Sequence, residues 1–344
     1  MRPSFFHHLH PPTIPAPQAR FRYTLGAGGL SVYLGLVTIA TGILEMFYYV
    51  PTPEGAAESI QTLTFLVPYG WLVRNLHYWS AQALVVVVGI HLLRVVLTGA
   101  YAPPRRFNYL LGMCLLALCF LLDFSGYILR WDQGVRWALV TGTNLLKTIP
   151  LLGAGIYGFV MGGDQPGGPT VIRFYAWHAF GLTILLAGVG VWHLFRVRRD
   201  GGIAVPPPQE RVDFRRINRS VLVRREFLAV LLASALLVLL SALVPAPIAP
   251  PITESGNQIA DVRAPWFFLW VQQLLHWGDP FLLGVLIPSL LLALIAILPY
   301  AMRNASPSQL GIWFPAGNRA AQIIVGLAFA ALLILTIMSL ISKS

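Results

Sequence analysis

Four histidines in two apolar segments are the side chains of this sequence whose types and spacing best suit chemistry. His91 follows His77 at position i+14, and His193 follows His178 at position i+15. At about 1.5 Å of rise per helical residue, each separation corresponds to roughly 21–22 Å along a helix. Fourteen positions are just under four turns, so the members of a pair lie near one face of their helix. Two such helices can clamp one flat ring near each side of a membrane.

Haem ligation is the chemistry that this pattern favours. An ionisable side chain inside a membrane span is costly and is usually functional. A single histidine would be explained as a hydrogen-bonded core residue, but two matched pairs are hard to explain in that way. Histidine is a common ligand of haem iron. Because two imidazoles leave no open position on the iron, the pattern predicts electron transfer rather than oxygen binding.

Glycines repeat the same spacing in two other apolar segments. Gly28 and Gly42 are 14 apart, and so are Gly112 and Gly126. A glycine lets a flat group approach the helix backbone closely. Glycine is also common where membrane helices pack on one another. Taken with the histidines, the spacing favours clearance for a haem.

Arginines near the histidines are candidates for binding haem propionates, because a guanidinium group pairs well with a carboxylate. The alternative is an interfacial side chain that reaches the membrane surface, which fits Arg105 better than Arg74 or Arg94. The four candidates are Arg74, Arg94, Arg105 and Arg173.

The composition identifies the elements that must position these side chains as membrane helices. Of 344 residues, 56% are hydrophobic and 11% are charged, whereas a soluble chain carries about 25% charge. The mean hydropathy is +0.69. We therefore expect an all-α, polytopic membrane protein, with about 20 apolar residues in each span. Seven spans are predicted, near 26–50, 76–98, 110–129, 172–195, 226–244, 281–300 and 319–341.

The arrangement of charge predicts the orientation of the spans. The net charge is +11. With the N-terminus in the cytoplasm, 17 of the 24 basic residues fall in cytoplasmic segments. Since cytoplasmic loops of membrane proteins are enriched in Lys and Arg, this orientation is favoured, and the basic charge requires no nucleic-acid partner.

The chain is predicted to divide into three parts. Residues 1–205 form a four-helix, haem-binding domain, 206–225 form a cytoplasmic linker rich in proline and arginine, and 226–344 form a three-helix C-terminal domain. Cys114 and Cys119 lie in one apolar run without metal-binding spacing and are expected to be core residues. The N-terminal segment, with His7, His8 and His10, lacks the apolar centre of a signal peptide and is expected to lie irregularly at the membrane surface.

Five motifs resemble the cytochrome b/b6 family, and together they span nearly all of residues 20–205. The i, i+15 spacing of His178 and His193 resembles the photosynthetic, b6-type branch. The C-terminal part resembles, more loosely, a small three-helix subunit (subunit IV) that is a separate chain in photosynthetic complexes and is fused here. The motifs are RNLHYWSA (74–81), GIHLLRVVLTGAYAPPR (89–105), SGYILRWDQ (125–133), IPLLG (149–153) and RFYAWHAF (173–180).

The resemblance implies a role for each site. His77 and His178 would ligate an outer, low-potential b haem, and His91 and His193 an inner, high-potential b haem. Arg198 stands at the position of a family arginine at the inner, quinone-reducing site. An outer quinol-oxidation site would include the short helix from about Gly134 and the segment 264–268. The predicted quinol-site residues are Tyr127, Trp131, Gly134, Pro265, Trp266 and Phe267.

Two departures from the family pattern bear on these roles. The family signature Pro-Glu-Trp-Tyr reads Ala264-Pro265-Trp266-Phe267 here, so the glutamate that usually accepts a proton from quinol is absent. Relatives that use menaquinone often vary at this position, which makes menaquinone a candidate. Glu254, Asp261 and Asp279 are candidates to replace the glutamate. The photosynthetic branch attaches a further haem through a cysteine where this chain has Gly26, so we predict no covalent haem.

The function implied is that of the cytochrome b subunit of a proton-translocating, quinol-oxidising bc-type complex. The resemblance implies a Rieske iron–sulfur protein, a c-type cytochrome or other acceptor, membrane lipid and a homodimer as partners. The expected location is a bacterial inner membrane or an internal photosynthetic membrane. Two alternatives remain: a di-haem anchor that passes electrons between quinone and a dehydrogenase or hydrogenase, and a haem-free transporter.

Overall fold

Among the residues that the computed structural model describes, seven helices are long and apolar enough to cross a membrane, which confirms the predicted number. The structure describes residues 11–206, 215–252 and 263–342. His7, His8, His10, Glu254 and Asp261 lie outside these ranges. The spans are α3 (Ala27–Met46), α5 (Gly70–Leu97), α6 (Arg106–Leu129), α9–η2–α10 (Gly168–Ala176, Trp177–Gly181, Leu182–Arg199), α11 (Arg219–Leu243), η5–α13 (Phe281–Leu286, Ile287–Ala301) and α14 (Arg319–Ile341).

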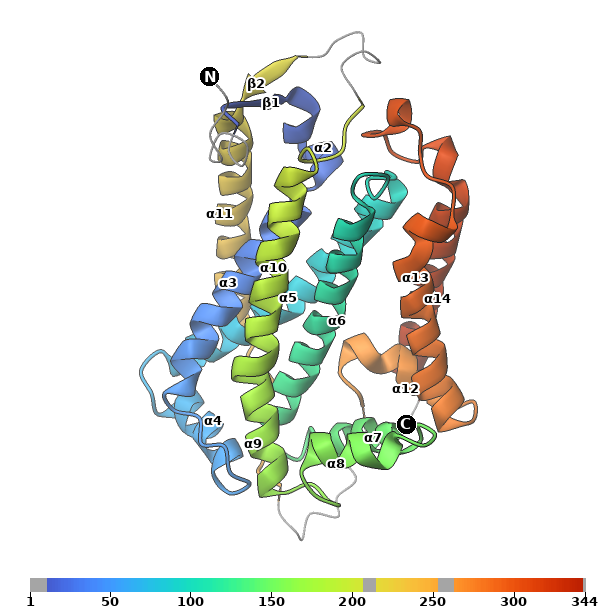
Figure 1. The fold of residues 1–344 in the computed structure, drawn as a ribbon. Helices are drawn as coiled ribbons and strands as arrows, with labels where there is room; N and C mark the ends of the chain where they lie inside the picture. The colour runs from blue at the N-terminus through green and yellow to red at the C-terminus, as the bar shows by residue number, and fades with distance from the viewer. Residues whose placement is uncertain (1–10, 207–214, 253–262, 343–344) are drawn as a thin grey trace.

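Shorter elements cover the two ends of the helices (Figure 1). The predicted inner end carries a small antiparallel sheet of β1 and β2, in which Ile14 pairs with Ile217. These elements are β1 (Thr13–Pro15), η1 (Ala16–Ala19), α2 (Phe21–Thr24), β2 (Arg216–Asn218), η6 (Pro307–Gln309) and η7 (Ala316–Asn318). Those at or toward the predicted outer end are α4 (Gly55–Phe65), α7 (Arg136–Lys147), α8 (Gly153–Met161), η4 (Trp266–Phe268) and α12 (Leu269–Leu275).

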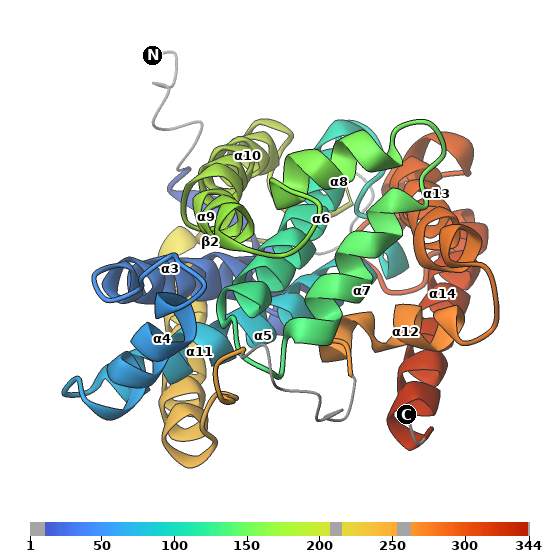
Figure 2. The ribbon, with the colours of Figure 1, turned by 90° about the horizontal axis from the view of Figure 1, so that it is seen from below.

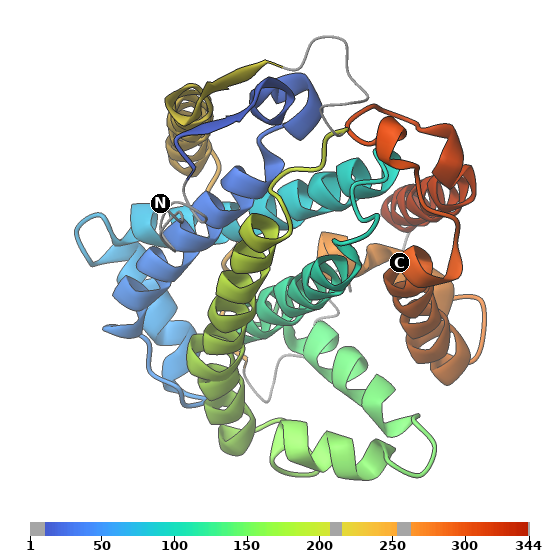
Figure 3. The same ribbon diagram turned by 45° about the horizontal axis from the view of Figure 1, so that its top comes forward.

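The three C-terminal spans are divided between two sides of the molecule. Helix α11 packs against α3 and α5, whereas α13 packs against α6 and α14 packs against α5. Figure 1 shows α11 on the left and the α13–α14 pair on the right, and Figure 3 shows the same separation from the inner end. Helix α5, which contacts both α11 and α14, therefore lies between the two groups of C-terminal spans. Helix α11 begins at Arg219, within the segment predicted as a linker.

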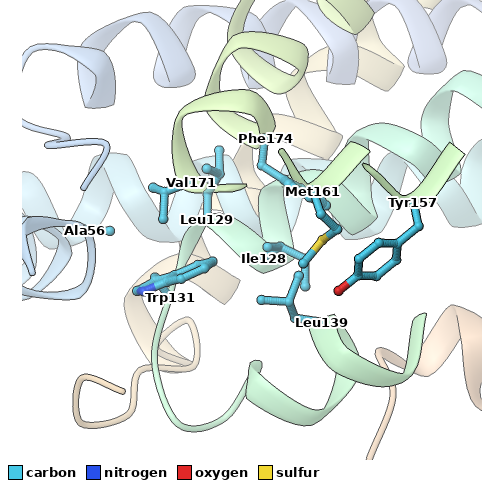
Figure 4. Close-up of a cluster of buried hydrophobic side chains, with 9 residues drawn as sticks. All are labelled: Ala56, Ile128, Leu129, Trp131, Leu139, Tyr157, Met161, Val171 and Phe174. Atoms are coloured by element: carbon cyan, nitrogen blue, oxygen red, sulfur yellow. The ribbon is translucent and has the colours of Figure 1, made fainter. Parts of the chain in front are cut away.

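A buried cluster fixes α7 and α8 across the outer end of the bundle. Ile128 lies in the last turn of α6 and Trp131 follows the end of that helix. Both pack with Leu139 of α7, Met161 of α8 and Phe174 of α9 (Figure 4). All five side chains are buried. Seen from below, α7 and α8 run across the end of the bundle between α9 and α13 (Figure 2). This arrangement makes a platform, defined here as residues 136–161, over the outer half of the bundle.

A second cluster joins α5 and α6 to the C-terminal pair of helices. Val96 and Tyr109 pack with Leu298 of α13 and Ala321 of α14, and all four are buried. Tyr109 also donates a hydrogen bond to the Ile295 carbonyl at 2.9 Å. The outward faces of the spans expose large apolar side chains such as Leu232 and Leu327, as helices in contact with lipid do.

Candidate functional site

Each of the four predicted glycines lies against one of the four histidine rings. A methyl group added at Gly126 would lie 2.7 Å from His178 Cε1, a distance that real side chains do not tolerate. The added carbon would lie 3.0 Å from the ring at Gly42 and His77, 3.4 Å at Gly28 and His91, and 3.5 Å at Gly112 and His193. The glycines of α3 thus receive the histidines of α5, and those of α6 receive the histidines of α10 and the turn before it. Clearance of the haem face itself stays a prediction.

The outer histidines face one another across the bundle with fixed ring orientations. The ring centroids of His77 and His178 are 6.2 Å apart. His77 Nδ1 lies 3.0 Å from the Thr38 carbonyl, and His178 Nδ1 lies 3.1 Å from the Leu122 carbonyl. A carbonyl only accepts hydrogen bonds, so each Nδ1 carries the proton and each Nε2 keeps its lone pair for a metal.

The distance between these rings suits two ligands on one metal ion. A bond from an imidazole nitrogen to a metal such as zinc is about 2.0–2.1 Å, and each ring adds the distance from its centre to its nitrogen. Hydroxyl groups give each ring a second partner, since Thr41 Oγ1 lies 3.1 Å from His77 Nδ1 and Ser125 Oγ lies 3.0 Å from His178 Nδ1. The outer pair therefore has the donor set that a bis-histidine haem requires.

The inner histidines have fewer hydrogen-bond partners. His193 Nδ1 lies 3.1 Å from the Asn108 carbonyl, whereas His91 Nδ1 is buried without a partner among the described residues. Arg94 Nε donates to the Tyr23 carbonyl at 3.0 Å. Arg94 Nη2 is also buried and has no hydrogen-bond partner among the described residues. A buried, unpaired guanidinium nitrogen beside the inner histidines fits a carboxylate of a bound group such as a haem propionate.

A π-helical turn explains how the two histidine pairs match despite their different spacings. Residues Trp177–Gly181, which include His178, form η2, where the helix is wider than an α-helix. A π turn closes i→i+5 bonds and so absorbs one additional residue. The i, i+15 pair of His178 and His193 therefore presents both rings on one side, as the i, i+14 pair does in the regular helix α5.

A cavity of about 730 Å³ opens beside the outer histidines. Its walls come from α3, α4, α5, α6, η2–α10 and η4, and they are mainly apolar. Of the predicted residues, the lining includes Gly42, Arg74, His77, Gly126, Tyr127, His178, Pro265, Trp266 and Phe267. Residues from three of the five motifs and from the segment 264–268 thus meet at one cavity that is large enough for a small organic molecule.

Two predicted quinol-site residues support this cavity rather than line it. Trp131 is buried in the platform cluster and has a positive φ of 46°, which few residues of its size adopt. Gly134 accepts a hydrogen bond from the Tyr127 hydroxyl at 2.9 Å through its carbonyl. Arg130 and Asp132 form an ion pair at 2.7 Å between them. These contacts fix the chain that leads from α6 to the platform.

The other three predicted propionate arginines also donate hydrogen bonds to backbone carbonyls. Arg74 donates to Ala246 at 3.2 Å and to Pro247. Arg173 donates to Gly158 at 2.9 Å and to Phe159, and Arg105 donates to Gly202 at 3.2 Å. Burial lowers the pKa of Arg105, and the nearby Asp200 opposes that shift. The propionate role of these arginines stays a prediction, as does the inner-site role of Arg198, which lies near Arg219 and Glu226.

Sequence reasoning missed several polar residues that line the cavity. They include Glu45 on α3, Gln82 on α5 and Asp123 on α6. Glu45 Oε1 is buried and has no partner among the described residues. An acidic residue within an apolar span is itself a signal of function, and Glu45 and Asp123 both meet that criterion.

Tyr49, which also lines the cavity, closes one wall of it. Its hydroxyl donates to the Leu129 carbonyl at 2.8 Å, and its ring stacks on Tyr175 at 5.5 Å. Burial raises the pKa of Tyr49, so its phenol stays protonated. Tyr49 therefore joins the end of α3 to α6 and α9.

Comparisons with known proteins show the family to which the chain belongs. A family model described as cytochrome b/b6/petB matches residues 14–201, more than half of the chain. Cytochrome b6 of Heliobacterium modesticaldum is 35% identical over 187 residues, which are 54% of this chain and 88% of that protein. Cytochrome b6 of Acaryochloris marina is 35% identical over 185 residues, which are 54% of this chain and 85% of that protein.

The similarity in fold extends beyond the part of the chain that these relatives cover. A solved structure described as a hyperthermophilic respiratory Complex III matches with a TM-score of 0.74. The match covers 93% of this chain and 92% of that one, at 21% identity. The C-terminal helices thus share an overall fold with that structure, while the sequence similarity is strongest in residues 14–201.

Proposed function

Since the chain belongs to the cytochrome b/b6 family, we propose that it is the cytochrome b subunit of a complex that oxidises quinol at the outer cavity and reduces quinone at the inner end. The observation that carries this proposal is the pair of facing imidazoles, His77 and His178, beside the 730 Å³ cavity. A ligand in that cavity would lie next to the site of the first electron carrier.

Two haems would be held by His77 with His178 and by His91 with His193. When bound, they supply one-electron carriers on the two sides of the membrane. The residues of this chain fix the tautomer of three of these imidazoles through the carbonyls of Thr38, Leu122 and Asn108. A hydrogen-bonded Nδ1 also makes Nε2 a stronger ligand.

The outer cavity would bind quinol through apolar walls and few polar groups. Tyr127, Pro265, Trp266 and Phe267 line it, whereas Trp131 and Gly134 hold the adjoining chain in place. Arg198, near the inner end of α10, would contribute to the inner quinone site. Release of protons outside and uptake inside would add to a proton gradient. Menaquinone remains our candidate substrate, because the segment Ala264–Phe267 lacks a glutamate.

The proposed partners are a Rieske iron–sulfur protein and a c-type cytochrome or other acceptor, in a homodimeric complex within lipid. The proposed location is a bacterial inner membrane or an internal photosynthetic membrane, with the N-terminus in the cytoplasm. The domain division into 1–205, 206–225 and 226–344 likewise stays a proposal.

Haem stoichiometry with quinol-dependent reduction tests the proposed function. The complex would be purified with its partners, assayed by pyridine haemochrome, and then reduced by menaquinol in an optical titration. We expect two non-covalent b haems per chain and reduction of both by quinol. One haem would show that a ligand pair is misassigned. Two haems that donate only to a tightly bound dehydrogenase would favour the di-haem anchor, and no haem would contradict the proposal.

A further inference from the structure

The outer cavity needs a proton acceptor that the segment Ala264–Phe267 does not provide. Oxidation of a quinol to a quinone releases two protons, whereas Ala264, Pro265, Trp266 and Phe267 carry no group that accepts one at neutral pH. Asp279 is exposed, and its Oδ1 accepts a hydrogen bond from the Leu282 amide at 2.9 Å at the start of η5. It does not belong to the cavity lining.

Asp123 is the carboxylate that the fold links to this segment. It lies on α6 and lines the cavity. Gln82 Nε2 donates to Asp123 Oδ1 at 3.3 Å, and Trp266 Nε1 donates to Gln82 Oε1 at 2.6 Å. The indole nitrogen only donates, so the amide of Gln82 must present its oxygen to Trp266 and its NH₂ group to Asp123. Three helical segments thus orient one carboxylate in the cavity.

The cost of placing Asp123 where it lies argues for a role that needs its charge. The residue stands in the apolar run Leu121–Phe124 of a membrane span, where an ionisable side chain is expensive. A link between helices would need only an amide or a hydroxyl group at this position. Its Gln82 partner keeps the carboxylate oriented and supplies one hydrogen bond to the ionised form.

We propose that the Asp123 carboxylate accepts the proton of a quinol hydroxyl in the outer cavity, an inference that rests on the proposed function. The transfer breaks one O–H bond of quinol, forms an O–H bond on a carboxylate oxygen of Asp123, and leaves the electron pair on the quinol oxygen. Gln82 and Trp266 are positioning residues, because they act through Asp123. The resulting quinolate then loses its electrons to the one-electron acceptors named above.

Other titratable groups near the cavity do not replace Asp123 in this role. The groups that face it are the Tyr78 phenol on α5 and the Cys119 thiol on α6, and the Arg130 guanidinium interacts with Tyr78 in turn. Glu45 lies across the cavity on α3, where the Arg74 guanidinium and the His77 imidazole are its neighbours. Asp123 alone among these groups is joined through hydrogen bonds to the Trp266 segment.

The test compares variants of the purified complex by two measurements. The first is the rate of quinol-dependent electron transfer as a function of pH, and the second is the redox-induced infrared difference spectrum. Asp123→Asn keeps the size and the polar link but removes the base. We expect its rate to fall by about 10²–10⁴-fold, the usual contribution of a positioned base. We also expect it to lose the acidic limb of the pH profile, where protonation of the carboxylate stops the reaction. Its haem spectrum should match that of the wild type.

The conservative variant, one variant of a positioning residue and two controls separate this role from a structural one. Asp123→Glu should restore most of the rate and move the acidic limb upward by about 0.4 pH units, the difference between the two ordinary carboxyl pKa values. Trp266→Phe should alter the carboxyl band in the infrared spectrum. Asp164→Asn, at an exposed outer aspartate, should leave rate, profile and spectrum unchanged. Glu45→Gln should keep the acidic limb.

The outcomes distinguish the inference from the proposed function. A wild-type complex that is not reduced by quinol would contradict the proposed function and this inference with it. A wild type that is reduced, together with an Asp123→Asn variant of unchanged rate and profile, would overturn the inference alone. Loss of the acidic limb in Glu45→Gln instead would also overturn it. If Asp123→Asn failed to assemble, an unshifted profile in Asp123→Glu would be decisive against it.

Discussion

The outer and inner halves of the helix bundle hold their histidines in different ways. In the outer half, His77 and His178 each contact both a carbonyl and a hydroxyl group, and the 730 Å³ cavity adjoins them. In the inner half, His193 has a carbonyl partner and His91 has none among the described residues. Neither inner histidine belongs to the lining of that cavity.

This difference indicates how one fold would give the two proposed haem sites different properties. Hydrogen bonds to Nδ1 raise the basicity of a ligating imidazole and so favour the oxidised metal. The outer site, with more such bonds, should therefore have the lower reduction potential. The inner site keeps a buried Arg94 nitrogen unpaired among the described residues, and a nearby positive charge favours the reduced metal. Both effects would direct electrons from the proposed outer haem to the proposed inner haem.

Removal of one histidine from each pair should have the largest effect and tests the pairing itself. His178→Ala should eliminate the outer haem, and His193→Ala should eliminate the inner one, because each iron would lose a ligand. Pyridine haemochrome assays and redox titration should then report about one haem per chain with the remaining potential unchanged. Two haems in either variant would contradict the assignment of that ligand.

Addition of a methyl group at the glycines should weaken haem binding more in the outer half than in the inner half. Gly126→Ala would place a carbon 2.7 Å from His178, whereas Gly112→Ala would place one 3.5 Å from His193, an ordinary contact. Overpacking of this kind costs about 1–3 kcal/mol. We expect outer haem affinity to fall roughly 5- to 150-fold in Gly126→Ala, as measured by haem retention during dilution. Equal losses in Gly112→Ala would count against the difference in packing.

Removal of one hydroxyl partner should raise the potential of the outer haem by a smaller amount. Ser125→Ala removes a hydrogen bond to His178 that contributes about 0.5–1.5 kcal/mol. With 59 mV per tenfold change for one electron, the outer potential should rise by about 20–60 mV. Ser31→Ala is the control, since that hydroxyl bonds only within its own helix, to the Ala27 carbonyl. A shift of the inner haem instead would reverse the assignment of the two sites.

Substitution of one tyrosine in each half compares two matched hydrogen bonds and should have the smallest effect. Tyr49→Phe in the outer half and Tyr23→Phe in the inner half each remove one bond from a phenol to a carbonyl, with Leu129 and Ala204 as acceptors. Each should cost about 0.5–1.5 kcal/mol in thermal stability. The raised pKa of Tyr49 means that its contribution is complete below about pH 10 and is lost only above it. Unfolding scans between pH 6 and 9 should therefore show a constant difference for Tyr49→Phe.

The sequence predicted the spans and the histidines because both depend on local patterns. Mean hydropathy and proline positions predict the seven spans, and spacing within a single helix predicts the histidine pairs. The start of α5 at Gly70 escaped prediction because Arg74 and Asn75 look unsuited to a membrane helix. The structure buries both by contacts with residues far along the chain, and Asn75 exchanges hydrogen bonds with Ser241 and Ala246.

The polar chain from Asp123 through Gln82 to Trp266 could not be predicted for a related reason. Its three members come from α6, α5 and η4, and no local spacing relates them. The same holds for the packing of α11 on α3 and α5, far from α13 and α14, because hydropathy gives the length of a span but not its neighbours. Site geometry depends on such long-range placement.

The π-helical turn at His178 has a consequence for how this family can change length. An insertion in an ordinary helix rotates everything that follows by about 100° and would turn His193 away from the bundle. A π turn confines the additional residue to Trp177–Gly181, so that the side chains of α10 keep their orientation toward the bundle. Deletion of a single residue there would be absorbed by a return to the regular helix. A chain with either spacing between these two histidines, i+14 or i+15, can therefore present both rings to the bundle.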